Sequence, residues 1–223
     1  PLLKDTALDA APDAGDLGAV AAVFLDRPDL RPAQTVTELS ELWLTREERN
    51  RLTCWAAAAP MLSVHLASWS EHYVARDIDA GHFLIMDVGK VCPPYLPAHG
   101  QADMFTYELF IEGVPVVVDS GIYEYEVGPW RDYFRSTRAH NTLEIAGQNQ
   151  SEVWRNFRVA RRARVLEVQT GSLEGVEWCA ARHDGYRCLK RGGDHLRQVV
   201  WLKPDIWIVI DEVVDACGVA YEN

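Results

Sequence analysis

The sequence predicts a mainly β protein, an antiparallel β-sandwich (supersandwich) preceded by two helices. From Trp69 onward, short segments rich in β-branched and aromatic residues alternate with turn signals, and no helical periodicity separates them. Residues 1–60 differ, because their apolar residues recur at helical spacing. The 223 residues are 48% hydrophobic and 25% charged, which is typical of a globular protein and not of a disordered chain.

Two helices are predicted in the N-terminal part. The first covers the apolar stretch 17–25 and ends at Arg27-Pro28, since proline disfavours helical continuation. The second begins at Thr35 or Thr37, where the sequence 37–41 has the character of a capping box. Its apolar stripe consists of Leu39, Leu42, Trp43 and Leu52. Two helices this short bury little surface, so we expect them to pack on the following sheet or on a part outside this chain.

Nine strands are predicted after the helices. Their ranges are 70–77, 82–88, 104–111, 114–119, 140–146, 159–169, 176–183, 196–202 and 207–214. The loop 77–81, the Glu112-Gly113 pair and the turn 203–205 supply connections of the kind that join neighbouring antiparallel strands. The predicted domains are therefore a helical segment at 1–65 and a β-sandwich at 66–223.

The net charge of −11 disfavours nonspecific binding to nucleic acid or to an anionic membrane surface. The window 131–164 is an exception, because it contains eight arginines and three acids. It therefore carries +5, and the remainder of the chain carries −16. Such a cluster indicates either a surface for an anionic ligand or solvated strand faces paired with scattered acids.

No apolar run is long enough for a membrane helix, and no signal-peptide pattern opens the chain, which begins at Pro1 and has the character of a fragment. The five cysteines show no paired spacing, which predicts buried or free thiols. The tryptophans on strand patterns, Trp154, Trp178, Trp201 and Trp207, are interpreted as core residues more readily than as sugar-stacking platforms.

Several polar segments lie in loops and at strand ends, where functional sites usually occur. With their flanking residues they are Tyr95–Asp103, Tyr107–Leu109, Val118–Gly121, Tyr133–Thr142, Gln148–Trp154, Phe157–Ala163 and His183–Tyr186. In this order the segments resemble the C-terminal domain of the heparinase II/III family, over the range from about residue 69 to the end. The resemblance implies an enzyme that combines an N-terminal α/α toroid with a β-sandwich and cleaves uronic-acid-containing polysaccharides by β-elimination. It also implies that the helical segment 1–65 is the remnant of that toroid and that the sandwich at 66–223 is truncated at its C-terminal end.

The resemblance also implies a zinc site and a cleft residue. The family pattern has a histidine in the substrate cleft, which corresponds to His99, and metal positions that correspond to Gln101, Asp119 and His140. Histidine and aspartate are ordinary zinc ligands, whereas the amide of Gln101 is a poor one and stands where the family has histidine. A structural zinc ion and a hydrogen-bonded polar group without metal are both consistent with these residues.

β-Elimination on a uronate requires a base for the C5 proton, neutralisation of the carboxylate, and protonation of the leaving oxygen. His99 and Tyr133 are the candidate catalytic residues for the proton steps, although Tyr133 is equally consistent with a packed tyrosine. Arg135 and Asn141 are the candidate substrate-binding residues, because such side chains bind carboxylates. Further catalytic groups are expected from the toroid.

The expected partner is an anionic polysaccharide, alginate-like or glycosaminoglycan-like, together with the toroid domain of the same protein and a second copy in a homodimer. The expected location is periplasmic or secreted, with the cytoplasm as the alternative. The rival hypothesis is a non-catalytic carbohydrate-binding or structural sandwich that has lost activity, with the Gln101 substitution as its sign.

Overall fold

The computed structural model describes residues 14–31, 43–55, 63–67 and 70–215. The helical elements are α1 (Ala14–Phe24), η1 (Pro28–Leu30), α3 (Arg46–Cys54), α4 (Pro129–Phe134) and η2 (Thr137–Ala139). The strands are β1 (Ser63–Ala67), β2 (His72–Asp77), β3 (His82–Asp87), β4 (Tyr107–Ile111), β5 (Val114–Val117), β6 (Val153–Trp154), β7 (Arg158–Val159), β8 (Val165–Leu173), β9 (Val176–His183), β10 (Asp194–Leu202) and β11 (Ile206–Val214). None of the helices in these ranges has the length and apolar character needed to span a membrane.

The chain divides into two compact units, a helical one that ends at Met61 and a β unit from Leu62 onward. In the helical unit, α1 confirms the first predicted helix. Thr45 caps α3 with a capping box, in which the Thr45 hydroxyl accepts from the Glu48 amide and the Glu48 carboxylate accepts from the Thr45 amide. A new helix therefore starts at Arg46, and the predicted single helix through Leu52 is wrong. The capping sequence predicted at 37–41 lies outside the described residues.

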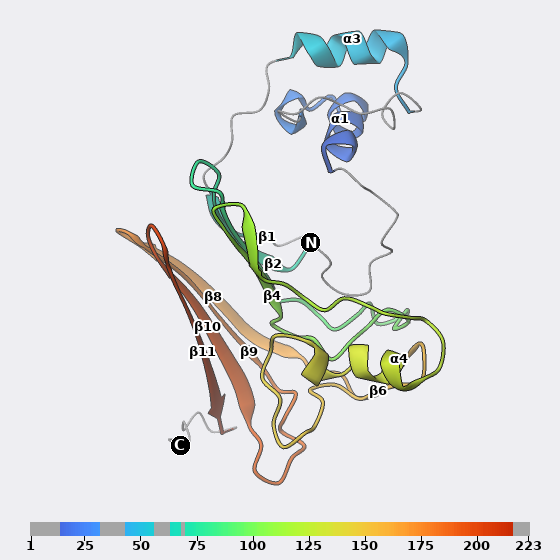
Figure 1. Cartoon of the computed structure of the whole chain (residues 1–223), viewed down its shortest axis with the longest axis vertical. Helices are drawn as coiled ribbons and strands as arrows, with labels where there is room; N and C mark the ends of the chain where they lie inside the picture. The colour runs from blue at the N-terminus through green and yellow to red at the C-terminus, as the bar shows by residue number, and fades with distance from the viewer. Residues whose placement is uncertain (1–13, 32–42, 56–62, 68–69, 216–223) are drawn as a thin grey trace. The chain divides into compact units, whose positions relative to one another are not determined.

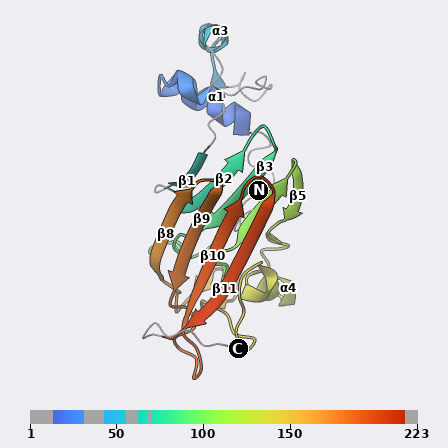
Figure 2. The ribbon, with the colours of Figure 1, turned by 90° about the vertical axis from the view of Figure 1, so that its left-hand side faces the viewer.

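The β unit contains two main antiparallel sheets, and it confirms the predicted sandwich (Figure 1). One sheet has five strands in the order β1-β2-β3-β4-β5, so each strand pairs with its neighbour in sequence. The other has four strands in the order β11-β10-β9-β8, which lie side by side in Figure 2. A third, short pairing joins β6 and β7.

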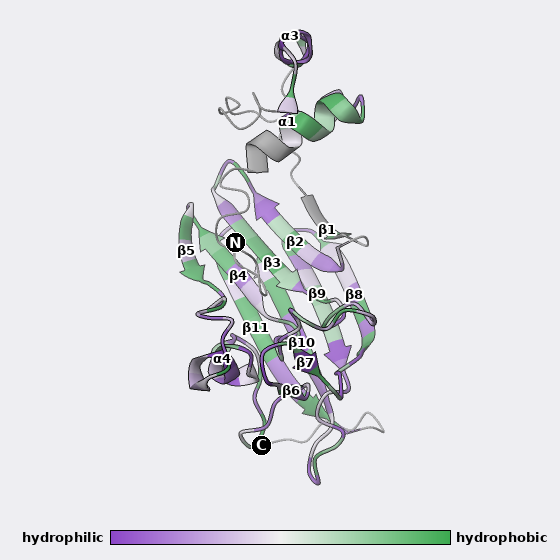
Figure 3. Ribbon diagram, turned by 90° about the vertical axis from the view of Figure 1, so that its right-hand side faces the viewer, coloured by the Kyte–Doolittle hydropathy of each residue, from purple (hydrophilic) through white to green (hydrophobic). Residues whose placement is uncertain are grey.

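The hydrophobic core lies between the two main sheets. Tyr73, Leu84 and Met86 contribute from the five-stranded sheet and are 1% exposed or less. Val199 and Trp201 belong to the same cluster from the four-stranded sheet. The hydrophobic stretches of β3, β4 and β11 stand out in Figure 3. The cysteines in the described ranges are free thiols, as expected: Cys54, Cys92, Cys179 and Cys188.

Two strand predictions are wrong. The range 140–146 forms no strand. The side chain of Asn141 makes hydrogen bonds to the amide and the carbonyl of Tyr107, which a strand at this position would otherwise use. Ala146 also adopts a left-handed conformation, with φ of 52°. The range 159–169 is interrupted between β7 and β8. Arg161 lies in that interruption and donates to the carbonyls of Gln150 and Gly185. Sequence patterns missed β1, β6, β7 and α4 as separate elements.

A chain of buried polar side chains crosses the interior at β9, β10 and β11. The Gly185 amide donates to Nδ1 of His183, so the ring proton of His183 sits on Nε2 and is donated to Nδ1 of His195 at 3.0 Å. Nε2 of His195 then donates to Asp211 at 2.6 Å, and Arg197 holds the same carboxylate through two parallel hydrogen bonds. Each neutral histidine therefore has one donor and one acceptor role, fixed by its neighbours.

Burial lowers the pKa of His183 well below its ordinary value, and His195 and Arg197 lower it further. Burial also lowers the pKa of His195, although the hydrogen bond to Asp211 opposes this shift. Burial by itself would raise the pKa of Asp211, but the hydrogen bonds from His195 and Arg197 outweigh it and hold that pKa well below the ordinary value. This group of buried side chains therefore contains two neutral imidazole rings, His183 and His195, next to the ion pair of Arg197 and Asp211.

We predict that Arg197→Leu lowers the free energy of unfolding by about 3–5 kcal/mol, since the Asp211 carboxylate would lose its cation and two carbonyls would lose a donor. Arg164→Leu is the matched control, because Arg164 also pairs with an aspartate, Asp184, but its side chain is 78% exposed. That variant should cost less than about 1 kcal/mol. Urea unfolding measures both, and equal costs would contradict the prediction.

We also predict that unfolding becomes easier as the pH falls below about 6.5, the pKa of histidine in an unfolded chain. The folded pKa values of His183 and His195 are lowered, so at acid pH the unfolded state binds more protons and stability declines. The decline reaches up to about 1.4 kcal/mol per pH unit for each proton taken up. His183→Gln keeps an amide donor and a carbonyl acceptor without titrating, so its decline should be shallower. Identical slopes in urea titrations at pH 7.5, 6 and 5 would refute this origin.

Candidate functional site

The loop that carries His99 is held by the buried side chain of Arg135, which follows α4. Nε and Nη2 of Arg135 donate to the Gly100 carbonyl at 3.2 and 2.7 Å. Nη1 donates to the carbonyl of Arg155 at 2.6 Å, and Nη2 also reaches that of Arg158. One guanidinium therefore joins the His99 loop to the short β6–β7 hairpin.

His99 itself is exposed to solvent beside aromatic rings. Its ring meets Tyr125 edge-on, with centroids 6.1 Å apart, and meets Phe157 at 6.4 Å. Tyr125 and Phe157 stack nearly parallel, and the guanidinium of Arg131 lies over both rings. Arg131 is fully buried and donates to the Asn156 carbonyl, so the cluster has a rigid base.

Tyr133 lies on α4 and is 42% exposed. It contacts Phe134 and Trp130 edge-on, with centroid separations of 5.3 and 6.4 Å. Trp130 and Phe134 in turn contact Tyr123, which is 66% exposed. The rings of α4 and of the preceding loop therefore form an exposed aromatic surface, and Tyr133 is both packed against neighbours and accessible.

Arg135 and Asn141 have a different environment from the one predicted. Arg135 is 1% exposed, and its donors are directed at main-chain carbonyls, as described above. The Asn141 carboxamide accepts from the Tyr107 amide at 2.9 Å and donates to the Tyr107 carbonyl at 2.8 Å, as a neighbouring strand would. These contacts argue against the predicted substrate-binding roles, because the polar groups that would bind a carboxylate are already used to position the backbone.

Asp119 and His140, which are 21 residues apart, come together. Nδ1 of His140 donates to Oδ2 of Asp119 at 2.7 Å, and both side chains are fully buried. Asp119 also accepts from the Thr106 hydroxyl and from the Gly121 amide. Gln101 is 0% exposed and lies in the same loop as His99. Burial by itself lowers the pKa of His140, but the hydrogen bond to Asp119 and the negative charge of Asp103 outweigh it, so this pKa is raised.

The zinc ion that the resemblance implies stays a prediction. In this structure both oxygens of Asp119 accept hydrogen bonds, and one of them directly contacts Nδ1 of His140. Across the described ranges, no group of three or more His, Cys, Asp and Glu side chains is placed to hold a metal ion. Asp119 and His140 are therefore joined by a direct hydrogen bond.

The sequence patterns missed the aromatic residues around His99 and Tyr133. Tyr123, Tyr125, Trp130 and Phe157 were not among the predicted site residues, nor was Arg131. The available signal was the density of aromatic residues in the range 123–134, which contains five of them in twelve positions and has few other apolar residues. Asp103 was also missed, although it lies in the polar loop and affects His140 electrostatically.

The comparisons with known proteins identify the β unit. Residues 62–218 match the sequence profile described as heparinase II/III-like, C-terminal. A heparin-sulfate lyase from Pedobacter heparinus is 30% identical over 129 residues, which are 56% of this chain and 17% of that enzyme.

Solved structures show the same fold. A heparan sulfate lyase from Pedobacter heparinus superposes with a TM-score of 0.62 at 18% identity, over 96% of this chain and 29% of that chain. A heparinase III structure gives 0.55 at 22% identity, over 71% of this chain and 23% of that one. The chain thus spans less than a third of the length of each of these relatives. Because the profile matches well over half of its residues, the chain belongs to the heparinase II/III-like C-terminal family.

Proposed function

We propose that this chain forms the sandwich side of the cleft in a polysaccharide lyase, which acts by β-elimination on a uronic-acid-containing polysaccharide. Membership of the family supports the enzyme class, since the similar proteins are heparin- and heparan-sulfate lyases by name. The observation that carries the proposal is the exposed imidazole of His99 on a loop that a buried arginine fixes in place. A proton-transfer group must be both accessible and held still.

We assign the proton-transfer roles to His99 and Tyr133. Both side chains reach solvent, and both stand on fixed elements, one on the loop held by Arg135 and the other on α4. The imidazole can remove a proton from C5 of the uronate, and the phenol can protonate the departing oxygen, or the reverse. The remaining catalytic groups come from the toroid in this proposal, so the present chain alone should show negligible turnover.

Arg155 and Arg158 are better placed than Arg135 to face the anionic polymer. Both are exposed, and their guanidinium groups lie over the Trp154 ring at 6.0 and 4.8 Å from its centroid. Their main-chain carbonyls accept hydrogen bonds from the same Arg135 guanidinium that holds Gly100. The two exposed guanidinium groups therefore lie close to the His99 loop, where they can neutralise a uronate carboxylate or a sulfate. Arg135 is the positioning residue both for the His99 loop and for the hairpin that carries Arg155 and Arg158.

The second candidate function is a non-catalytic carbohydrate-binding sandwich, which the exposed aromatic surface around Tyr123 and Trp130 favours. Incubation of the full-length protein with alginate, heparan sulfate and related polyuronates separates the two. The lyase releases unsaturated uronates that absorb in the near ultraviolet, whereas the binding module retains the polymers without any such release. The homodimer and the periplasmic or secreted location stay predictions.

We predict that His99→Ala in the full-length enzyme lowers turnover by about 10²–10⁴-fold, the usual contribution of one proton-transfer group. Folding should be unchanged, because the side chain is exposed. Leu96→Ala is the matched control, since Leu96 is 55% exposed on the same loop and carries no titratable group. Release of unsaturated product and circular dichroism measure the two effects. Unchanged turnover in His99→Ala would show that His99 is only a loop histidine.

We predict that Gln101→His increases zinc affinity, because an imidazole replaces an amide at the position that the family pattern groups with Asp119 and His140. Competition with a chromogenic chelator gives the affinity, and elemental analysis gives the metal content of both proteins. Gln101→Asn, which changes the side chain without adding a ligand, is the control. If Gln101→His binds no more zinc than the unchanged protein, the three positions do not form one metal site.

A further inference from the structure

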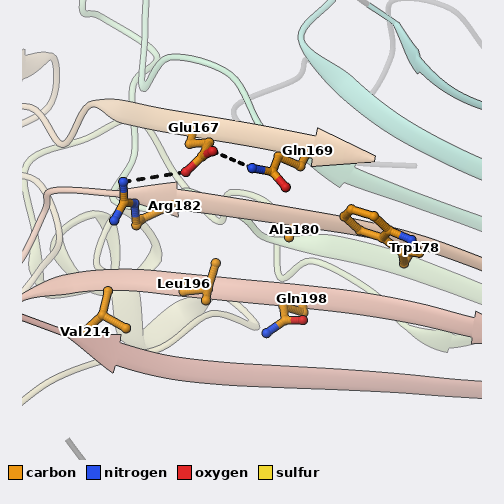
Figure 4. A pocket seen from close by; sticks show the side chains of 8 residues that line it. All are labelled: Glu167, Gln169, Trp178, Ala180, Arg182, Leu196, Gln198 and Val214. Carbon is orange, nitrogen blue, oxygen red and sulfur yellow. Dashed lines mark hydrogen bonds and ion pairs between the residues drawn. The ribbon is translucent and has the colours of Figure 1, made fainter. Parts of the chain in front are cut away.

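The outer face of the four-stranded sheet, which points away from the core, contains a hollow of about 510 Å³ (Figure 4). Its lining residues come from all four strands and are Glu167, Gln169, Trp178, Ala180, Arg182, Leu196, Gln198 and Val214. None of them belongs to the loops or to α4, which carry His99 and Tyr133. The hollow is therefore a separate feature of the sandwich.

Strand register arranges these side chains in three rows across the sheet. Across β8, β9 and β10 the rows are Gly171, Trp178 and Val200; Gln169, Ala180 and Gln198; Glu167, Arg182 and Leu196. Residues that alternate along a strand point to the same face, so all three rows share the outer surface. One row is aromatic and apolar, the next presents two carboxamides, and the third is charged.

Trp178 forms a flat plate at one end of the hollow. A Cβ atom at Gly171 would lie 2.5 Å from three atoms of the indole, so only glycine leaves room for the ring to lie across β8. The side chain of Trp178 points to the outer face, because successive side chains of a strand alternate and the neighbouring Cys179 points into the core. Trp178 is therefore not the core residue that its strand pattern indicated. An aromatic ring held flat on a surface binds the C–H face of a sugar ring well.

The row next to the plate supplies hydrogen-bonding groups. Gln169 and Gln198 stand two strands apart, which places their backbones about 9–10 Å from each other. Ala180 lies between them and leaves the gap open. The Gln169 amide donates to Glu167, whereas the Gln198 carboxamide makes no hydrogen bond to another residue in the described ranges. Planar amides on both sides of a gap can donate to and accept from hydroxyl groups.

The charge of the third row selects against anions. Arg182 is matched by Glu167 at 3.6 Å and lies 3.9 Å from Asp194, which also pairs with Arg187. Glu212 stands opposite Leu196 at the outer side of the row. Three acids thus accompany two arginines at this end of the hollow, so a carboxylate or sulfate would meet net negative charge. This distinguishes the hollow from the arginines at Trp154, which suit an anionic polymer.

We propose that the hollow is a second carbohydrate-binding site, which takes an uncharged saccharide segment stacked on Trp178 and hydrogen-bonded by Gln169 and Gln198. The site performs no chemistry. It holds the protein on a neutral glycan and leaves the surface around His99 uncovered. This inference goes beyond the proposed function and does not depend on it, because the two surfaces share no residue.

Affinity electrophoresis of the full-length protein tests the proposal, with gels that contain mixed-linkage β-glucan or galactomannan as neutral polymers and alginate or heparan sulfate as anionic ones. We expect at least one neutral polymer to retard the protein. Trp178→Ala should weaken that binding about tenfold or more, as expected when an aromatic stacking partner is lost. Trp178→Tyr should retain part of it, because the ring remains.

Two further variants keep the test decisive if Trp178→Ala fails to fold. Ala180→Met fills the gap between the two glutamines from an outward position and should abolish the binding. Leu173→Ala removes an apolar side chain that is 74% exposed on β8 but does not line the hollow, and it should bind normally. Lyase activity on anionic polymers should be unchanged in all four variants. Retardation by anionic polymers only, by no polymer at all, or equally in Ala180→Met and the unchanged protein would overturn the proposal.

Discussion

The guanidinium of Arg197 is the interaction on which much of the sandwich depends. The side chain starts on β10, is 3% exposed, and makes four hydrogen bonds in the interior. Two go to Asp211 on the adjacent strand, and two go to the carbonyls of Phe105 and Asn141, which flank the other sheet. A buried cation requires partners on every side, so this single group fixes the distance and registration of one sheet relative to the segments around β4.

The consequences extend to the Asp119–His140 pair. Because Arg197 fixes the Asn141 carbonyl, the Asn141 carboxamide can pair with the main chain of Tyr107, and its oxygen lies 3.2 Å from the Thr106 hydroxyl oxygen. The Thr106 hydroxyl also contacts Asp119, which accepts from His140. The buried acid–imidazole pair is thus the end of a continuous network that begins at an ion pair in the opposite sheet. A network of this kind is stabilising only when every member is satisfied.

Arginine has the same role at the candidate site. Arg131, Arg135 and Arg161 lie in the positively charged window of the sequence, and each donates to main-chain carbonyls. The two interpretations of that window therefore do not describe these three arginines, which donate hydrogen bonds to the main chain. Arg155 and Arg158 remain as exposed cations. The buried Arg131 and Arg135, together with the more exposed Arg161, hold the loops, and Arg155 and Arg158 give the surface around His99 its positive charge.

The sandwich supports two surfaces of different chemistry. The loops between β3 and β4 and between β5 and β8 combine exposed aromatic rings, His99 and cations, which suits an acidic polymer. The outer face of β8–β11 combines an indole plate with amides and excess acid, which suits an uncharged one. Rigid sheets with alternating side chains can carry both, because the inward residues form the core and the outward residues are free to vary.

The sequence by itself determined the class of fold, most of the strands and the family. Alternation in segments such as 82–87 and 206–214 reflects burial on one face, which is a local property of the chain. It also identified Asp119 and His140 as partners through the family pattern. Only the tertiary structure decided that Arg135 and Asn141 serve the backbone, that 140–146 is not a strand, and that Trp178 faces outward over Gly171. Each of these depends on hydrogen bonds or space supplied by residues distant in sequence, and no local pattern encodes which carbonyl or ring will be there.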